Sequence, residues 1–145
     1  MHKGYNMIKK ITNSIAIAIF TVVVVVTILV LSNPLRRSRE RIRTDMFNHT
    51  PIGMSMDEVV GVIENNDNWE IRRTRDHGYA IRSGSPDITL SSGDKNIIGV
   101  KAMEVTIGSY NFFFVAGKMT VYVFYAFDED SKLIDIAVVK LSMHI

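Results

Sequence analysis

The sequence predicts an α+β protein in which an N-terminal transmembrane helix precedes one or two helices packed on a mainly antiparallel sheet of about four to six strands. Three observations predict it: an early charge-free apolar block, a helix-start motif before an amphipathic stripe, and period-two alternation through the second half. They divide the chain into a basic tail (1–13), a transmembrane helix (14–32), an Arg-rich juxtamembrane helix (33–49) and a small α+β domain (50–145).

The apolar block is the strongest single feature. No charged residue occurs between Lys10 and Arg36, and residues 15–31 are apolar except for Thr21 and Thr27. At about 1.5 Å per residue this run covers about 25 Å, close to the hydrocarbon thickness of a bilayer. A charge inside a span costs on the order of 3 kcal/mol, so its absence is informative. We therefore expect a single-pass protein of the cell membrane.

Two other interpretations compete with an anchor. In a cleavable signal peptide the apolar region is about 7–15 residues long, and here Val30 and Ser32 would form a poor cleavage site. A buried helix or strand is the second alternative, since residues 22–26 have strand propensity. The length of the run, followed by Pro34 and an Arg block, favours the anchor over both.

Charge is unevenly distributed along the chain. The net charge is +2, but the tail holds three lysines and no acid. The rest has 17 − 3 = 14 basic residues against 15 acidic ones, a net charge of −1. A near-neutral domain gives no reason to expect nucleic acid as a partner. Cysteine is absent, which excludes disulfides, lipidated cysteine, thiol nucleophiles and zinc–thiolate sites.

Five arginines follow the apolar block and bear on orientation. Counted against the lysines before the block, they favour a cytoplasmic domain. The short basic tail instead resembles the start of a signal-anchor, and long domains translocate largely regardless of charge, so we expect the domain outside the cytoplasm. We interpret the arginines as a collar that contacts lipid headgroups of the bilayer, with a dedicated partner or nucleic-acid site as the alternative. They are Arg36, Arg37, Arg39, Arg41 and Arg43.

Two helices are expected after the anchor. Residues 35–48 form the first, and Thr50 ends it because the residue before a proline disfavours the α region. Ser55 and Glu58 have capping-box spacing and start the second. Its buried stripe at i, i+3, i+4 and i+7 is Met56, Val59, Val60 and Ile63, and the polar residues 65–68 close it.

The remaining chain predicts strands. Residues 69–74 and 79–82 read as a hairpin, residues 83–96 as an exposed loop around a short strand at 88–90, and residues 100–107 as a further strand. Residues 108–111 are expected to turn the chain into a strand over 112–115. The clearest signal is a final hairpin near the middle of the sheet, with strands over 119–127 and 133–141.

No set of residues commits the chain to a reaction, so we expect no catalytic residue, cofactor or metal site. The four histidines, His2, His49, His77 and His144, have no partner at metal-ligand spacing. Asp128, Glu129 and Asp130 lack the ligand spacing of a calcium loop and suit a polar hairpin turn instead.

The aromatic residues provide the candidate partner surface. A period-two strand exposes one of each adjacent pair unless both sheet faces are covered, and one short helix does not cover two faces. An aromatic patch left exposed would mark a surface that faces the membrane or a partner, such as another membrane or envelope protein. The candidate residues are Tyr110, Phe112, Tyr122 and Phe124.

Two segments resemble a known family. Gly53-Met54-Ser55, followed by Val59, resembles the opening of the SmpA/BamE-like and β-lactamase-inhibitor-like domains, and the segments 127–128 and 132–134 resemble their last hairpin. The layout of residues 33–145 also resembles that of small, uncharacterised membrane-anchored proteins of Gram-positive bacteria, which share Asn-Pro-Leu-Arg-Arg and Thr-Pro-Ile-Gly segments. SmpA-type proteins are lipoproteins, and this chain has no cysteine to lipidate.

This resemblance implies a binding or assembly module at an envelope surface. The sequence therefore predicts a membrane-tethered, non-catalytic module that binds an unknown ligand. The alternatives are a small membrane-bound hydrolase or transferase with dispersed site residues, and a regulator whose arginines sense anionic lipid.

Overall fold

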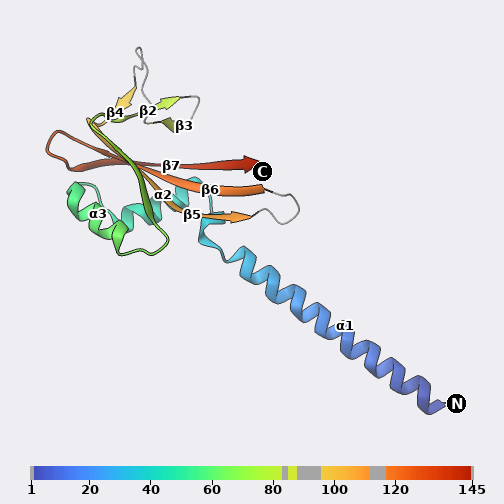
Figure 1. Cartoon of the computed structure of the whole chain (residues 1–145). Coiled ribbons are helices and arrows are strands. Elements are labelled where there is room, and N and C mark those ends of the chain that lie inside the picture. The colour runs from blue at the N-terminus through green and yellow to red at the C-terminus, as the bar shows by residue number, and fades with distance from the viewer. Residues whose placement is uncertain (1, 83–84, 88–95, 112–116, 145) are drawn as a thin grey trace. The chain divides into compact units, whose positions relative to one another are not determined.

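The computed structural model describes residues 2–82, 85–87, 96–111 and 117–144 and divides the chain into two compact units that meet at Arg36 and Arg37 (Figure 1). The first unit holds helix α1 (His2–Leu31) and a 3-10 turn, η1 (Pro34–Arg36). The second unit is α+β, as the sequence predicts. Its elements are α2 (Arg39–His49), α3 (Met56–Glu64), β1 (Glu70–Arg75), β2 (Tyr79–Arg82), β3 (Ser85–Asp87), β4 (Ile97–Ile98), β5 (Lys101–Asn111), β6 (Gly117–Phe127) and β7 (Leu133–His144).

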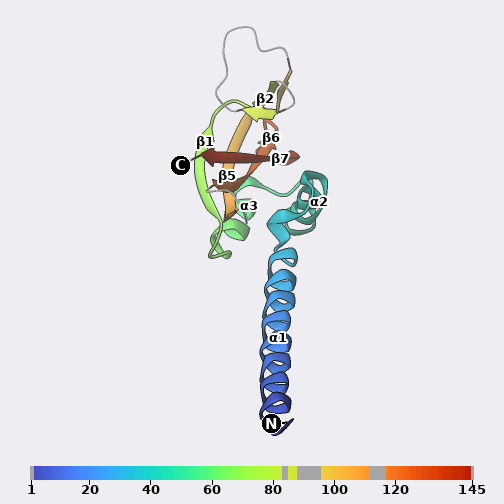
Figure 2. The same ribbon diagram turned by 90° about the vertical axis from the view of Figure 1, so that its right-hand side faces the viewer.

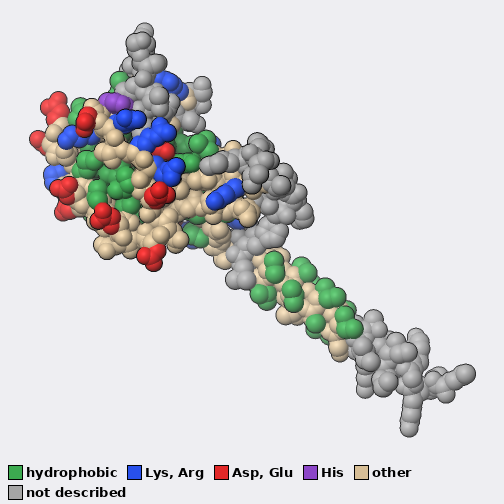
Figure 3. Space-filling view, in the orientation of Figure 1, with side chains coloured by type: hydrophobic (Ala, Val, Ile, Leu, Met, Phe, Trp, Pro, Cys, Tyr) green, Lys and Arg blue, Asp and Glu red, His purple; other side chains and the backbone are tan. Residues whose placement is uncertain are grey.

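Helix α1 runs through the predicted tail and most of the predicted span. Its side chains are described from residue 14 to residue 28, and all of them are exposed; Figure 3 shows apolar side chains along this stretch. The hydroxyl groups of Thr21 and Thr27 donate to the carbonyls of Ile17 and Val23, at 2.9 and 2.8 Å. Within the described portion of the chain, no helix is both long and apolar enough to cross a membrane. The transmembrane helix expected over 14–32 is not supported by this finding and stays a prediction.

The end of α2 at Thr50 and the start of α3 at Ser55 agree with the sequence predictions. Thr50 is the C-cap of α2, and its N–H and hydroxyl both donate to the Met46 carbonyl. In α3, the N–H of Ser55 donates to the Glu58 carboxylate at 2.8 Å, and the N–H of Glu58 donates to the Ser55 hydroxyl at 3.4 Å. The Ser55 hydroxyl also donates to the Glu58 carboxylate at 2.6 Å, and this hydrogen bond, together with the one from the Ser55 N–H, holds the pKa of Glu58 below its ordinary value. The capping box is therefore confirmed.

The helix expected over 35–48 is in fact two elements. Residues 34–36 form the 3-10 turn η1, and a separate helix begins at Arg39 with Ser38 as its N-cap. The N–H of Arg41 donates to the Ser38 hydroxyl at 3.3 Å. A serine that satisfies one of the free N–H groups of a first turn sets where the helix begins. Ser38 therefore determines where α2 begins.

The main sheet has four antiparallel strands in the order β1-β5-β6-β7. Strands β6 and β7 form the predicted final hairpin, with Val123 opposite Val138, but β7 lies at the edge of the sheet and not near its middle. In its polar connection, the N–H of Lys132 donates to the Asp128 carboxylate at 2.8 Å, and Ser131 adopts a φ of 57°. The Asp side chain thus bonds its local backbone, as the turn interpretation of 128–132 requires.

The two faces of the main sheet are covered by different layers. Helices α2 and α3 lie on one face, and a three-stranded sheet of order β3-β2-β4 lies on the other (Figures 1 and 2). Buried Met103, Val123 and Tyr125 fill the helix side, where the Tyr125 hydroxyl lies 3.9 Å from the Met46 sulfur. Burial raises the pKa of Tyr125 to about 12. On the opposite side, Tyr79 packs with Phe124.

The hairpin predicted over 69–82 is wrong. Strand β1 pairs with β5, and β2 pairs with β3 and β4. The reason is that the backbone at Gly78 crosses the backbone of Ile98 and Gly99 closely. A Cβ atom at position 78 would overlap the carbonyl oxygens of both residues. Gly99 itself has a φ of +77°, a conformation that favours glycine. The crossing sends the chain away from β1 and across the second face of the main sheet.

The turn expected at 108–111 is also wrong, because β5 continues to Asn111. Gly108 takes a φ of 132° at a register shift between Thr106 and Gly108, so it forms a bulge within the strand. The strands expected over 88–90 and 112–115 lie outside the described residues.

The crossing can be tested by Gly78→Ala. The added methyl group has no room beside the two carbonyls, so we expect a loss of about 1–3 kcal/mol in the free energy of unfolding. Gly61→Ala is the matched control, because no atom of the described residues lies within 4 Å of its Cβ position in α3. It should raise stability by about 0.5–1 kcal/mol. Denaturant titration of the full chain measures both, and equal stability of Gly78→Ala and wild type would contradict the crossing.

Candidate functional site

A pocket of about 370 Å³ lies beside β7, the edge strand of the main sheet. Three elements enclose it: the first turns of α2, the small sheet and the first half of β7. Its lining combines charged groups with apolar walls. The lining residues are Arg39, Glu40, Arg43, Tyr79, Ile81, Pro86, Asp135, Ile136, Ala137 and Val138.

Helix α2 presents its charged side chains to this pocket. Arg39 and Arg43 are four residues apart and therefore share one face of the helix, with Glu40 beside them. Ile42 and Met46 are buried on the core side. Because Ser38 caps the helix, it fixes where the first turn begins and so places Arg39 and Glu40 at the pocket.

One wall of the pocket is a network around Asp135. Arg43 Nη2 donates to Asp135 Oδ1 at 2.6 Å, and the Tyr79 hydroxyl donates to Asp135 Oδ2 at 2.6 Å. Arg43 Nε donates to the carbonyl of Ile136 at 2.5 Å, so it satisfies a backbone group on the open edge of β7. The guanidinium also lies 4.9 Å from the centre of the Phe47 ring. The network thus joins α2, β2 and β7.

The hydrogen bonds of this network suit a structural role for Tyr79 and Asp135 better than a role in proton transfer. Tyr79 is fully buried, and burial together with the Asp135 carboxylate raises the pKa of its hydroxyl, which stays a donor. Both oxygens of Asp135 already accept hydrogen bonds. A general base needs a free acceptor aimed at the proton it removes. Asp135 is therefore poorly placed for that role.

Among the described residues, ion pairs balance only some of the charges at the pocket. Arg43 is paired with Asp135, but within the described residues Arg39 and Glu40 have side chains that form no hydrogen bond or ion pair. Lys140 lies further along β7, and its Nζ donates to the carbonyl of Arg37 at 2.5 Å. Burial and the nearby Arg39 charge lower the pKa of Lys140.

The five arginines expected to form one collar have different environments. Arg36 lies in η1. Arg37 forms an ion pair with Asp45 at 3.0 Å, and Arg43 belongs to the Asp135 network. Arg39 lines the pocket, whereas Arg41 is exposed and does not.

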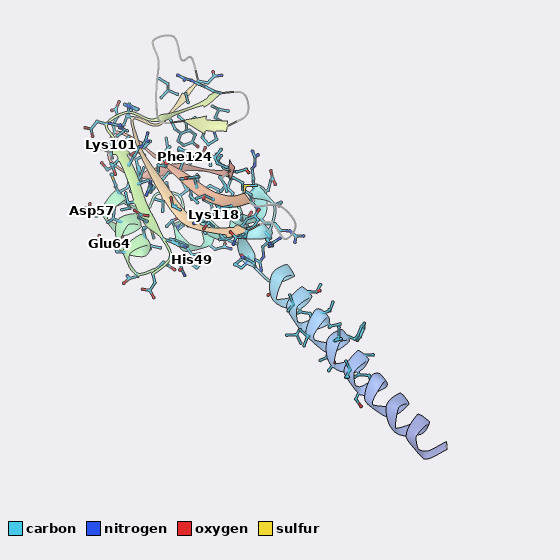
Figure 4. All side chains as sticks on the ribbon, turned by 45° about the vertical axis from the view of Figure 1, so that its right-hand side comes forward. His49, Asp57, Glu64, Lys101, Lys118 and Phe124 are labelled. Atoms are coloured by element: carbon cyan, nitrogen blue, oxygen red, sulfur yellow. The ribbon has the colours of Figure 1, made fainter. Side chains whose placement is uncertain are left out.

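The aromatic residues expected at a partner surface are mostly covered. Phe124 is buried against Tyr79 in an edge-to-face contact at 6.1 Å, within the domain (Figure 4). Tyr122 is half-buried, and Tyr110 is half-buried below Lys140, whose Nζ lies 5.6 Å from the ring centre. Phe112 lies outside the described residues. Phe124 and Tyr122 are covered because the small sheet packs on the second face of the main sheet.

The dispersed polar groups form no metal site among the residues that the structure describes. His49 packs edge-on against Trp69 at 5.9 Å, and His77 contacts the carbonyl of Gly78. Sequence reasoning did not find the pocket. The one available signal was the presence of two arginines and a glutamate on one face just after a serine cap.

The chain matches no family model, and no curated protein or solved structure is similar to it.

The Asp135 network can be tested by Tyr79→Phe. The change leaves Asp135 Oδ2 without its donor and should lower the free energy of unfolding by about 1–2 kcal/mol. Tyr122→Phe is the control, because within the described chain the Tyr122 hydroxyl makes no hydrogen bond; it should stay within about 0.5 kcal/mol of wild type. Denaturant titrations that show equal effects would contradict the assigned role of Tyr79.

Proposed function

We propose that the chain is a membrane-tethered, non-catalytic binding module, in which residues 14–32 anchor the α+β domain to the bilayer. One observation carries this proposal: the side chains of α1 from residue 14 to residue 28 are all exposed, and most are large and apolar. Ile17 is 66% exposed and Phe20 is 70% exposed. The domain holds a pocket that suits a ligand, and Asp135 in the lining of this pocket belongs to a structural network.

Exposure of so many apolar side chains of α1 to water is unfavourable. Removing one large aliphatic or aromatic side chain from water stabilises it by about 1.5–3 kcal/mol, so a helix with many of them in water is strongly unfavourable. A helix that is apolar all round belongs inside a protein or a membrane. Thr21 and Thr27 bond carbonyls four residues back, which supplies their hydroxyls with acceptors where water is absent.

The anchor can be tested by extraction of membranes at high pH. The full chain should stay in the membrane pellet. Val22→Asp combined with Val26→Asp places two charges in the apolar run, each costing on the order of 3 kcal/mol, and should move most of the protein to the supernatant. Release of the wild-type chain would refute the anchor.

A matched control keeps this experiment specific. Ile52→Asp combined with Ile134→Asp changes two exposed apolar residues of the domain, 56% and 40% exposed. This variant should stay in the pellet like wild type. If it leaves the membrane as readily as the α1 variant, the domain and not α1 holds the protein there.

We further propose that the domain lies outside the cytoplasm. The short basic tail before the apolar run supports this orientation. A reporter enzyme active only outside the cytoplasm, fused after Ile145, should give signal, and one active only in the cytoplasm should give none. The reverse pattern would place the domain in the cytoplasm.

A further inference from the structure

The outer edge of β7 is open over the second half of the strand. The carbonyl of Ile136 accepts a hydrogen bond from Arg43, so the backbone of Ile136 points away from β6. The register with β6 is unbroken from Asp135 to His144, and alternate residues present their N–H and C=O groups to the same edge, so those of Val138 and Ser142 also point outward. Within the described part of the chain these outward groups have no hydrogen-bond partner. Such an edge is a template for another strand.

The side chains of this stretch leave the edge accessible. Leu141 is 51% exposed, and Ser142 is exposed. Lysine side chains often protect a strand edge, but that of Lys140 turns back over its own sheet. Its Nζ donates to the carbonyl of Arg37 and lies 5.6 Å from the ring centre of Tyr110, which belongs to β5, two strands in from the edge. Figure 1 shows β7 running past the small sheet toward its end.

The open stretch is complementary to itself. Residues 138–144 span about 23 Å and pair in full with a second copy when Leu141 lies on a two-fold axis, opposite its own copy. Outward-facing residues then oppose each other, as an antiparallel ladder requires, and Lys140 faces Ser142 of the second copy. An axis at Lys140 would instead place two ammonium-bearing residues opposite each other, and like charges directly opposite are destabilising. The charge pattern therefore selects the axis at Leu141.

This register also covers the exposed leucine. Leu141 and its copy form a non-hydrogen-bonded pair, in which the Cα atoms lie about 4.5 Å apart and the side chains touch. Val139 points to the same face of the sheet and is buried within the domain. Pairing thus extends an apolar face of one copy across the axis to the other.

We propose that the second half of β7 binds the same strand of a second copy of this chain, antiparallel and with Leu141 on the two-fold axis. The inference goes beyond the proposed binding function and does not require the anchor. In this dimer His144 of the second copy lies opposite Val138, which lines the pocket, so each copy borders the pocket of the other. An interface of one strand from each copy is small, and we expect a dissociation constant of about 1–100 µM.

Disulfide trapping tests the register. The chain has no cysteine, so one introduced cysteine reports only its own symmetric contact. In non-ionic detergent, with fewer than one chain per micelle, mild oxidation should link Leu141→Cys into a dimer, because the pair on the axis brings its Cβ atoms within disulfide reach. Ile97→Cys is the matched control, since Ile97 is 47% exposed but lies in β4 of the small sheet. It should cross-link at least about tenfold more slowly.

Sedimentation of the full chain under the same conditions tests the strength of the contact. Wild type should show a concentration-dependent equilibrium between monomer and dimer. Leu141→Asp places two carboxylates opposite each other and should weaken the dimer at least about tenfold, whereas Ile97→Asp should dimerise as wild type does. Ser142→Pro removes an outward N–H and keeps the ladder to β6, so it should also weaken the dimer while its melting temperature stays near that of wild type.

Three results would overturn the proposal. The first is a wild-type chain that stays monomeric at about 500 µM, well above the expected range, which would leave the edge of β7 to a different chain. The second is cross-linking of Leu141→Cys no faster than that of Ile97→Cys. The third is a folded Leu141→Asp chain that dimerises like wild type, since another surface, such as α1, would then hold the two copies together.

Discussion

The inner strand β6 of the main sheet is apolar on both faces, and this constraint governs the rest of the domain. Along β6, Val123 and Tyr125 point to one side while Phe124 and Ala126 point to the other, and all four are buried. A sheet with water on one side would leave half of these residues exposed. The helices cover one face, so the chain between β1 and β5 must cover the second, and the small sheet does so.

This second layer also creates the pocket. Tyr79 leads β2 across the second face, and its hydroxyl reaches Asp135 at the edge of β7. From the other side, Arg43 of α2 reaches the same carboxylate and the neighbouring carbonyl of Ile136. An unpaired edge strand invites pairing with another chain, and a charged side chain bonded to that edge discourages it. At Ile136 the edge is thus protected by the network that forms a pocket wall.

Local features of the fold were predictable, and non-local ones were not. The capping box of Ser55 and Glu58 and the turn at Asp128 depend on neighbours within a few residues, so their patterns identify them. The pairing of β1 with β5 depends on a close backbone crossing that needs glycine at both 78 and 99. Hydrophobic periodicity in the sequence does not reveal such a crossing. Arg43 and Asp135 are 92 positions apart, so their pairing was equally hidden.

The arginine cluster shows why the site itself escaped prediction. Five arginines in a short segment after an apolar run resemble a headgroup collar, since sequence alone gives each the same chemistry. Folding gives them different roles: Arg37 and Arg43 acquire acidic partners from the domain, and Arg39 faces the pocket. Among the described residues Arg39 and Glu40 have no ion-pair partner, and a cation at a pocket can select between ligands, whereas a solvated collar responds mainly to total charge.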